Sequence, residues 1–125
     1  MPSGAARGDP MAERIYHCPV EVTMEVVGAK WVPVILAHLK ENDHLRFAQI
    51  RRLVPGITEK MLTQRLRELE SIRIVDRTLV SSTPPHVEYR LTAEGRSLTP
   101  VLQAMYDWGR QWATTRRLTV APVLD

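Results

Sequence analysis

The chain has 125 residues, of which 44% are hydrophobic, with a formal net charge of +3 at neutral pH and a single cysteine. This length suits one domain with a modest core, and one cysteine excludes an internal disulfide. No apolar run reaches the roughly 18 residues of a membrane span, and the first residues lack the apolar region of a secretory signal. We therefore expect a cytoplasmic protein without a membrane partner.

Composition divides the chain into three segments. Residues 1–16 are rich in glycine, proline and small residues and are expected to form a disordered leader. Residues 17–116 are expected to fold as one domain, and residues 117–125 form a C-terminal tail whose sequence indicates no role.

Two helices are expected before residue 40. Pro19 suits the first turn of a helix, where its missing N–H is not needed, and apolar residues then recur at helical spacing until Gly28. Residues 30–39 predict a second, largely buried helix, provided that Pro33 lies in its first turn. The segment 45–47 favours a very short strand.

A helix-turn-helix is the central prediction. A short helix begins near Phe47 and is stopped by Pro55, and Gly56 permits the tight turn that follows. Thr58 is placed to accept a backbone N–H as the N-cap of the next helix. At about 100° per residue, one side of that helix carries Leu62, Leu66 and Leu69.

The other side of this helix carries groups that can bind DNA, namely Lys60, Thr63, Gln64 and Arg67. Arginine pairs with guanine, glutamine with adenine and threonine with either, so Gln64 and Arg67 are the expected base contacts. The alternative is a polar face that only meets water.

Positive charge is concentrated around this helix. From Arg46 to Arg67 the charge is +6 − 1 = +5, which exceeds the +3 of the whole chain. Such a concentration is expected of a surface that neutralises DNA phosphates. The expected backbone contacts are Arg46, Arg51, Arg52, Thr58 and Arg65, although Arg65 lies near the buried edge and packing is its alternative.

After Leu69 the pattern becomes that of strands. Residues 74–80 and 86–91 are rich in β-forming residues, and the five residues 81–85 between them supply turn residues, including two prolines. We expect a hairpin whose tip is too long and stiff for a two-residue turn. A helix-turn-helix followed by a hairpin is a winged helix, with His86 and Arg90 as candidate DNA contacts or, alternatively, outer polar residues.

The last predicted helix begins at Thr92 as its N-cap, and Pro100 is expected to bend it. An apolar stripe along it is more than a small domain can cover, and tryptophans suit a subunit interface; core packing is the alternative. The stripe consists of Leu98, Val101, Leu102, Met105, Trp108 and Trp112. A symmetric dimer would place two reading helices about 34 Å apart on one face of DNA.

Six blocks of this sequence resemble, in order and spacing, the HxlR-type winged-helix regulators, which are similar in fold to MarR-type regulators. They are CPVE at 18–21, GAKW at 28–31, LRF at 45–47, PGITEKMLTQ at 55–64, PPHVEY at 84–89 and LTAEGR at 91–96. The resemblance implies a mainly α fold with a small β-hairpin and a long C-terminal dimerisation helix. It also implies a homodimeric transcription factor that binds an operator palindrome and represses or activates.

Two residues depart from the pattern of this family. Its members usually have glycine where this chain has Arg73, and a non-glycine residue in a left-handed helix cap costs about 1 kcal/mol, so we expect a differently built helix end. The wing usually has arginine where this chain has His86, which weakens a phosphate contact or makes it depend on pH.

Some members of the family use a cysteine at the position of Cys18 to sense oxidants, quinones or aldehydes. A helix N-terminus favours the reactive thiolate form, and His17 lies beside it. The resemblance therefore implies an oxidant or small-molecule effector at Cys18, with a structural cysteine as the alternative.

Two other functions compete with a DNA-binding regulator. A winged helix that serves protein assembly without reading DNA is the first, and the +5 segment argues against it. A small enzyme that uses Cys18 is the second, but the four histidines suggest no set of catalytic roles, and no metal-ligand spacing, phosphate cradle or cofactor motif is visible. We expect no enzyme activity, cofactor or metal.

Overall fold

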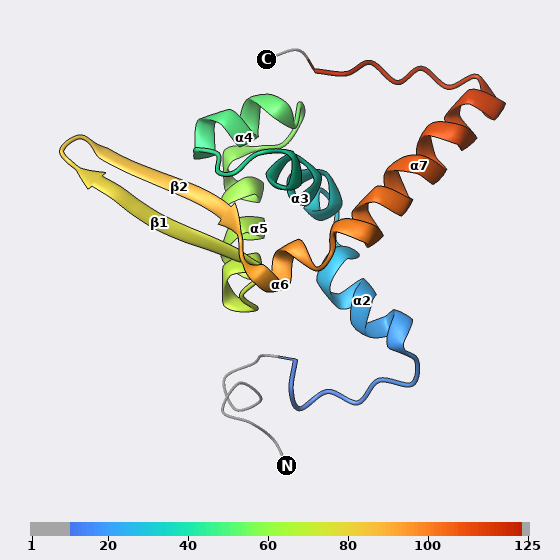
Figure 1. Cartoon of the computed structure of the whole chain (residues 1–125), viewed down its shortest axis with the longest axis horizontal. Coiled ribbons are helices and arrows are strands. Elements are labelled where there is room, and N and C mark those ends of the chain that lie inside the picture. The colour runs from blue at the N-terminus through green and yellow to red at the C-terminus, as the bar shows by residue number, and fades with distance from the viewer. Residues whose placement is uncertain (1–10, 124–125) are drawn as a thin grey trace.

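The computed structural model describes residues 11–123; most of the expected leader, residues 1–10, and the end of the tail, residues 124–125, lie outside the described residues. The elements are α2 (Pro19–Val27), α3 (Val32–Glu41), α4 (Phe47–Leu53), α5 (Glu59–Ser71), β1 (Val75–Ser82), β2 (Pro85–Leu91), α6 (Ala93–Arg96) and α7 (Thr99–Arg116). Figure 1 shows α3, α4 and α5 grouped at the centre, with the hairpin projecting from one side and α2 and α7 from the other. Within residues 11–123, no helix is long and apolar enough to cross a membrane.

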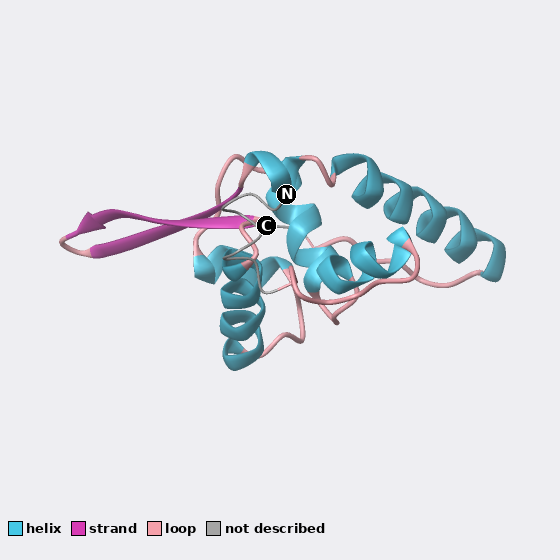
Figure 2. Ribbon diagram, turned by 90° about the horizontal axis from the view of Figure 1, so that it is seen from below, coloured by secondary structure: helices cyan, strands magenta, loops and turns pink. Residues whose placement is uncertain are grey.

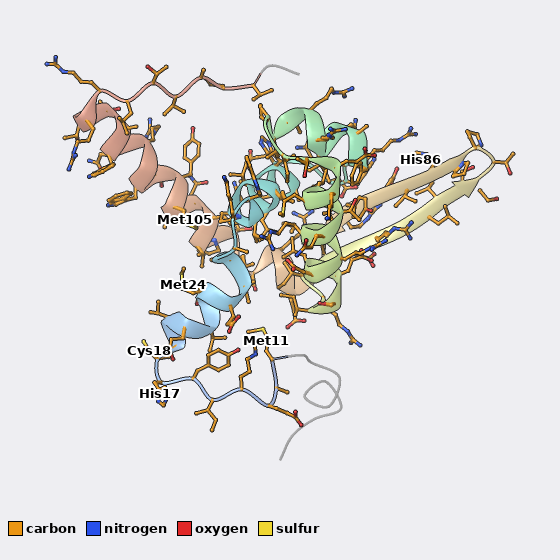
Figure 3. The ribbon with its side chains drawn as sticks, turned by 180° about the vertical axis from the view of Figure 1, so that it is seen from behind. Met11, His17, Cys18, Met24, His86 and Met105 are labelled. Carbon is orange, nitrogen blue, oxygen red and sulfur yellow. The ribbon has the colours of Figure 1, made fainter. Side chains whose placement is uncertain are left out.

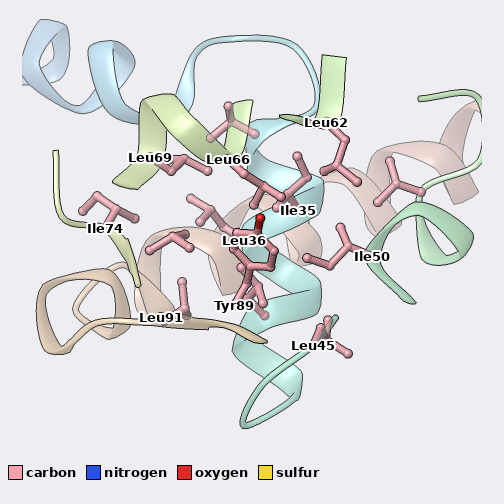
Figure 4. Packing of buried hydrophobic residues seen from close by; sticks show 14 of the residues in the cluster. Ile35, Leu36, Leu45, Ile50, Leu62, Leu66, Leu69, Ile74, Tyr89 and Leu91 are labelled. Carbon is pink, nitrogen blue, oxygen red and sulfur yellow. The ribbon is translucent and has the colours of Figure 1, made fainter. Parts of the chain in front are cut away.

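The core forms where α5 meets α3. Leu62, Leu66 and Leu69 of α5 are almost completely buried, as are Ile35 and Leu36 of α3, and Figure 4 shows these side chains facing one another. The predicted leucine side of α5 is therefore confirmed as its buried side, and full burial of each such side chain contributes about 1.5–3 kcal/mol.

An isolated antiparallel bridge between Leu45 and Tyr89 pairs the hairpin with the connection between α3 and α4. The Leu45 N–H donates to the Tyr89 carbonyl at 2.9 Å, and the Tyr89 N–H donates back at 2.8 Å. This bridge confirms the very short strand predicted before α4, and it fixes the base of the hairpin against the α3–α4 connection.

The expected five-residue hairpin tip is wrong. The strands continue to a pair between Ser82 and Pro85, with an irregularity in the register between Leu79 and Ser81, and only two residues connect them. The connection contains a cis Thr83–Pro84 peptide bond. Figure 2 shows the hairpin reaching beyond the helices as a two-stranded arm.

The expected single C-terminal helix is also wrong, because the chain forms α6 and then α7. Thr92 caps α6 as predicted, its Oγ1 accepting from the Gly95 N–H at 3.0 Å. Pro100 cannot lie inside a helix without clashing with the carbonyl four residues earlier. A new helix therefore starts at Thr99 with Pro100 in its first turn, and Pro100 does not bend it.

The end of α5 corrects the expectation for Arg73. Arg73 adopts the left-handed conformation, with φ 60°. Its N–H donates to the Glu70 carbonyl at 3.0 Å, and the Ile74 N–H donates to the Leu69 carbonyl at 3.0 Å. This is the hydrogen-bond pattern of a Schellman cap, so the helix ends as it would with glycine, and arginine bears the conformational cost of about 1 kcal/mol.

Gly95 lies where α6 crosses the start of the hairpin, and it provides a test of this packing. A Cβ at Gly95 would lie 2.2 Å from the Ile74 carbonyl oxygen. We expect Gly95→Ala to lower the free energy of unfolding by about 1–3 kcal/mol, measured by urea denaturation. Arg96→Ala, an exposed change on the same helix, should stay within about 0.5 kcal/mol. Equal stability of the Gly95 variant and the wild type would contradict this packing.

Candidate nucleic-acid interface

The start of α5 is fixed by the turn before it. Gly56 has φ 93°, a conformation that side chains rarely adopt. The Thr58 Oγ1 then accepts a hydrogen bond from the Met61 N–H at 3.0 Å, which confirms Thr58 as the N-cap. The N–H groups at this end of α5 and the acidic Glu59 in its first turn are the expected arrangement for a stable helix start.

The outward side of α5 carries the predicted DNA-reading residues. Lys60, Gln64 and Arg67 are exposed, and Thr63 is half-buried. The Thr63 hydroxyl donates to the Glu59 carbonyl at 2.9 Å, which leaves its oxygen as an acceptor. The leucine side turned inwards thus presents these four side chains on the opposite side, as the sequence predicts; their contacts with DNA stay a prediction.

The arginines expected to bind phosphates fall into two groups. Arg51 and Arg52 are exposed on α4, with Arg51 at 3.8 Å from Glu59. Arg46, also exposed, and Arg65 contact groups that lie 40 and 35 residues away in sequence. The Arg65 Nε donates to the Lys30 carbonyl at 3.1 Å, and its side chain is only 17% exposed, so this geometry favours the packing alternative for Arg65.

At the wing, charged side chains gather around one carboxylate. Glu88 is buried, and its Oε1 accepts from the Arg90 Nη2 at 2.9 Å. Its Oε2 lies 3.2 Å from the His86 Nε2 and 3.3 Å from the His44 Nε2. The two predicted wing contacts therefore both lie beside Glu88, Arg90 as a hydrogen-bond donor and His86 at 3.2 Å, and their contact with DNA stays a prediction.

Arg46 joins this cluster from the N-terminus of α4. Its Nε lies 2.8 Å from the His86 Nε2, and its Nη2 lies 2.8 Å from the His86 Nδ1. The guanidinium of Arg46, which was predicted to contact a phosphate, thus lies against the wing. Figure 3 shows His86 on the hairpin, on the side of the domain opposite to α2.

Glu88 is absent from the residues predicted from the sequence, although a signal for it exists. His86, Glu88 and Arg90 alternate along β2, so all three point to one side of the strand. A carboxylate between two basic residues on one side of a strand indicates an internal ion-pair cluster. His44 and Arg46 join this cluster only through tertiary packing, which the spacing along β2 does not indicate.

Cys18 lies at the N-cap of α2 and is exposed. The Glu21 carboxylate accepts a hydrogen bond from the Cys18 N–H at 3.1 Å, and His17 is exposed beside it. Figure 3 shows Cys18 and His17 at the outer end of α2, far from the hairpin. A reagent in solution can therefore reach the thiol.

The residues of the predicted interface stripe differ in exposure from one end of the stripe to the other. Leu102 is buried, while Leu98 and Val101 are half-buried at the start of α7. Met105, Trp108 and Trp112 are exposed, at 44%, 63% and 42%, and the two tryptophan rings stack with centroids 5.4 Å apart.

The first helix has a similar exposed apolar face. Val20 and Met24 of α2 are 63% and 54% exposed, and only Val27 of that helix is buried. Figure 3 shows Met24 and Met105 on the same side of the domain. This pair of faces on α2 and α7 is a large apolar surface for a chain of this size.

Among residues 11–123, no three histidine, cysteine, aspartate or glutamate side chains are grouped so as to hold a metal ion. The cluster at Glu88 is an ion-pair cluster with basic partners.

The arrangement of these elements defines a winged helix-turn-helix: α4 and α5 form the helix-turn-helix and the hairpin forms the wing. Residues 26–117 match the family described as HxlR-like helix-turn-helix. An HTH-type transcriptional regulator from Methanothermobacter thermautotrophicus is 43% identical over 107 residues, which cover 86% of this chain and 81% of that protein. The chain belongs to the HxlR-like helix-turn-helix family and is a DNA-binding transcriptional regulator.

Two similar solved structures are of regulators as well. One is the redox regulator HypR in its oxidized form, 45% identical, with a TM-score of 0.71, covering 75% of this chain and 96% of that one. The other is the reduced form of the regulator YodB from Bacillus subtilis, 37% identical, with a TM-score of 0.66, covering 77% and 94%. The mainly α winged-helix fold with a long C-terminal helix is therefore shown by the chain's own elements and by its relatives.

Proposed function

We propose that this regulator binds an operator palindrome as a homodimer, with α5 of each subunit in the major groove. The observation that supports this most is the outward side of α5, where Lys60, Gln64 and Arg67 are exposed while the opposite leucines are buried. Two such helices, related by a two-fold axis and about 34 Å apart, would match successive major grooves.

The side chains around α5 have different expected tasks. Gln64 and Arg67 face bases, because glutamine and arginine form paired hydrogen bonds with adenine and guanine. Lys60 and Thr63 complete the contact, and Arg51, Arg52 and Thr58 bind phosphates. Phosphate contacts fix the position of the helix, whereas base contacts determine the sequence that it prefers.

A change in base readout is the direct test. We expect Arg67→Ala to lose about 1–3 kcal/mol of binding free energy and to relax the preference at one base pair. Arg51→Ala should weaken binding to every sequence alike and reduce the salt slope by about 1. The measurement is fluorescence anisotropy on operator DNA, selected from random duplexes, and on scrambled DNA at several salt concentrations.

A matched control for this test lies on α7, which projects away from the wing. Arg110→Ala removes the same charge and should leave the preference unchanged. A wild-type protein without salt-dependent binding to any DNA would favour the alternative, a winged helix that serves protein assembly.

The proposed dimer uses the exposed apolar faces of α7 and α2. Trp108 and Trp112 are large, stacked and partly exposed, and such side chains contribute most where an interface excludes water. A second copy of the chain supplies the same faces, so that each exposed tryptophan can be covered by its two-fold related surface.

We expect Trp108→Ala to weaken dimerisation by about 2–4 kcal/mol, measured by sedimentation equilibrium. In this measurement the wild-type protein should have the mass of a dimer, which is twice the 14.3 kDa of one chain. Gln103→Ala, an exposed change on the same helix, serves as the control. An unchanged dimer in the Trp108 variant would show that α7 does not form the interface.

An oxidant or electrophile is the proposed effector, acting on Cys18. The thiol is exposed at the end of α2, whose apolar face belongs to the proposed interface. A quinone would add to the sulfur as a thioether. Alternatively, two Cys18 thiols would release two electrons and two protons to a diazene oxidant and form an intersubunit disulfide.

We expect modification of Cys18 by diamide or a quinone to change operator affinity at least threefold, because it alters the interface beside α2. Mass spectrometry confirms complete modification, and the Cys18→Ser protein is the control. Unchanged affinity of fully modified wild-type protein would contradict this effector.

A further inference from the structure

Four groups form a continuous chain of contacts from the α2–α3 connection to the reading side of α5. The Lys30 carbonyl accepts from the Arg65 Nε at 3.1 Å. The Arg65 Nη1 donates to the Glu68 Oε1 at 2.8 Å, and the Gln64 Nε2 donates to the Glu68 Oε2 at 3.3 Å. Each carboxylate oxygen of Glu68 thus has a different donor.

The anchor of this chain is Arg65. Its side chain is 17% exposed, against 49% for Glu68, and it binds a backbone carbonyl that lies 35 residues away in sequence. That carbonyl precedes Trp31, the left-handed N-cap of α3 with φ 79°, whose ring is covered by the Lys30 ammonium at 4.9 Å. The acceptor for Arg65 is therefore part of an ordered connection.

The contacts keep the Glu68 carboxyl ionised. The hydrogen bond from Arg65 has the largest effect and lowers the pKa of this carboxyl below its usual range. Burial opposes it with the next largest effect, and the hydrogen bond from the Gln64 amide and the charge of Arg65 lower the pKa further. An ionised carboxylate accepts hydrogen bonds only. Gln64 must therefore turn its amide nitrogen, and not its amide oxygen, toward Glu68.

This orientation has a consequence for base reading. When Glu68 binds the Gln64 N–H that is trans to Oε1, the cis N–H and Oε1 stay available side by side. Adenine presents one acceptor, N7, and one donor, the N6 amino group, in the major groove, which are the complements of that pair. A Gln64 side chain without Glu68 would sample both amide orientations and would lose rotamer entropy on binding.

We propose that Glu68 is a positioning residue that orients Gln64 for adenine, and that Arg65 anchors Glu68. The inference rests on the proposed function, in which Gln64 faces bases, and it deepens that function by assigning Glu68 a part in specificity. It also gives Arg65 a task other than a phosphate contact.

Glu68 has an electrostatic cost that makes the proposal testable. A carboxylate beside the DNA-reading side repels phosphates, so its removal should raise affinity for DNA in general. A residue that positions Gln64 should, on removal, also lower the discrimination for adenine. Higher affinity combined with lower discrimination at one base pair distinguishes a positioning role from a purely structural one.

The experiment compares Gln64→Ala, Glu68→Ala and the double variant with the wild type. An operator is selected from random duplexes with the wild-type protein, and each variant is measured by anisotropy on all four bases at every position. Gln64→Ala should lose about 5-fold to 150-fold discrimination at one adenine. Glu68→Ala should lose about twofold to tenfold at the same position and bind scrambled DNA as tightly as the wild type or more tightly.

Glu70→Ala is the matched control, because it removes the same charge from the same helix. It should keep the wild-type discrimination. In the double variant Glu68→Ala should have no further effect on discrimination, because Glu68 acts through Gln64. Thermal unfolding of each variant verifies that the helix is intact.

The outcomes distinguish a failure of the positioning role of Glu68 from a failure of the proposed function. If Gln64→Ala changes discrimination and Glu68→Ala does not, the positioning role is overturned and the proposed function stands. If Gln64→Ala leaves every position unchanged, both the reading role of Gln64 and the inference built on it are overturned. If Glu68→Ala lowers discrimination as much in the Gln64→Ala background as in the wild type, Glu68 does not act through Gln64.

Arg65→Met tests the anchor, since it keeps the aliphatic stem and removes the donors. Discrimination should fall at the same adenine, with the salt slope of the wild type. Uniformly weaker binding to all sequences, with a slope lower by about 1, would identify Arg65 as a phosphate ligand and overturn its role as anchor.

Discussion

The structure depends on the rotation of α5 about its own axis. Leu62, Leu66 and Leu69 are buried against α3, and a rotation of one residue, about 100°, would expose them. Burial of each contributes about 1.5–3 kcal/mol, so this rotation is strongly fixed. The outward direction of Gln64 and Arg67 is thus determined by hydrophobic packing on the far side of the helix, and no contact with DNA is required to establish it.

A second constraint is the buried carboxylate of Glu88. Burial of an ionised group is costly unless hydrogen-bond donors and opposite charges satisfy it. Here the neighbours are Arg90, His44 and His86, with Arg46 against His86. The wing is thereby tied to the start of α4, and the two basic side chains of β2, His86 and Arg90, both lie beside Glu88. In the DNA complex that we propose, contact with phosphates then falls more heavily on the exposed residues of α4 and α5.

The sequence predicted several features that are encoded locally, although it misjudged the hairpin tip and the break before Pro100, and it did not predict contacts between distant segments. The cap at Thr58 and the leucine side of α5 follow from spacing alone, and both are present. The left-handed Arg73 is held partly by a distant partner, because its carbonyl accepts from the Thr92 hydroxyl at 2.6 Å. Likewise, Arg65 meets Lys30 across 35 residues. Periodicity indicated which side chains point outward and which neighbours on one helix or strand can pair, but it could not indicate contacts between segments far apart in the chain.

Periodicity has another limit, which α2 illustrates. Val20 and Met24 recur at helical spacing and predict an apolar face, yet both are exposed in the monomer. An apolar pattern indicates that one face of a helix packs against other apolar residues. It does not indicate whether those residues belong to the same chain or to another molecule. If a second subunit provides them, as we propose, the interface includes α2, and the connection that follows α2 supplies the Lys30 carbonyl that holds Arg65. The same contacts that orient Gln64 would then connect the surface beside Cys18 to the side of α5 that reads DNA.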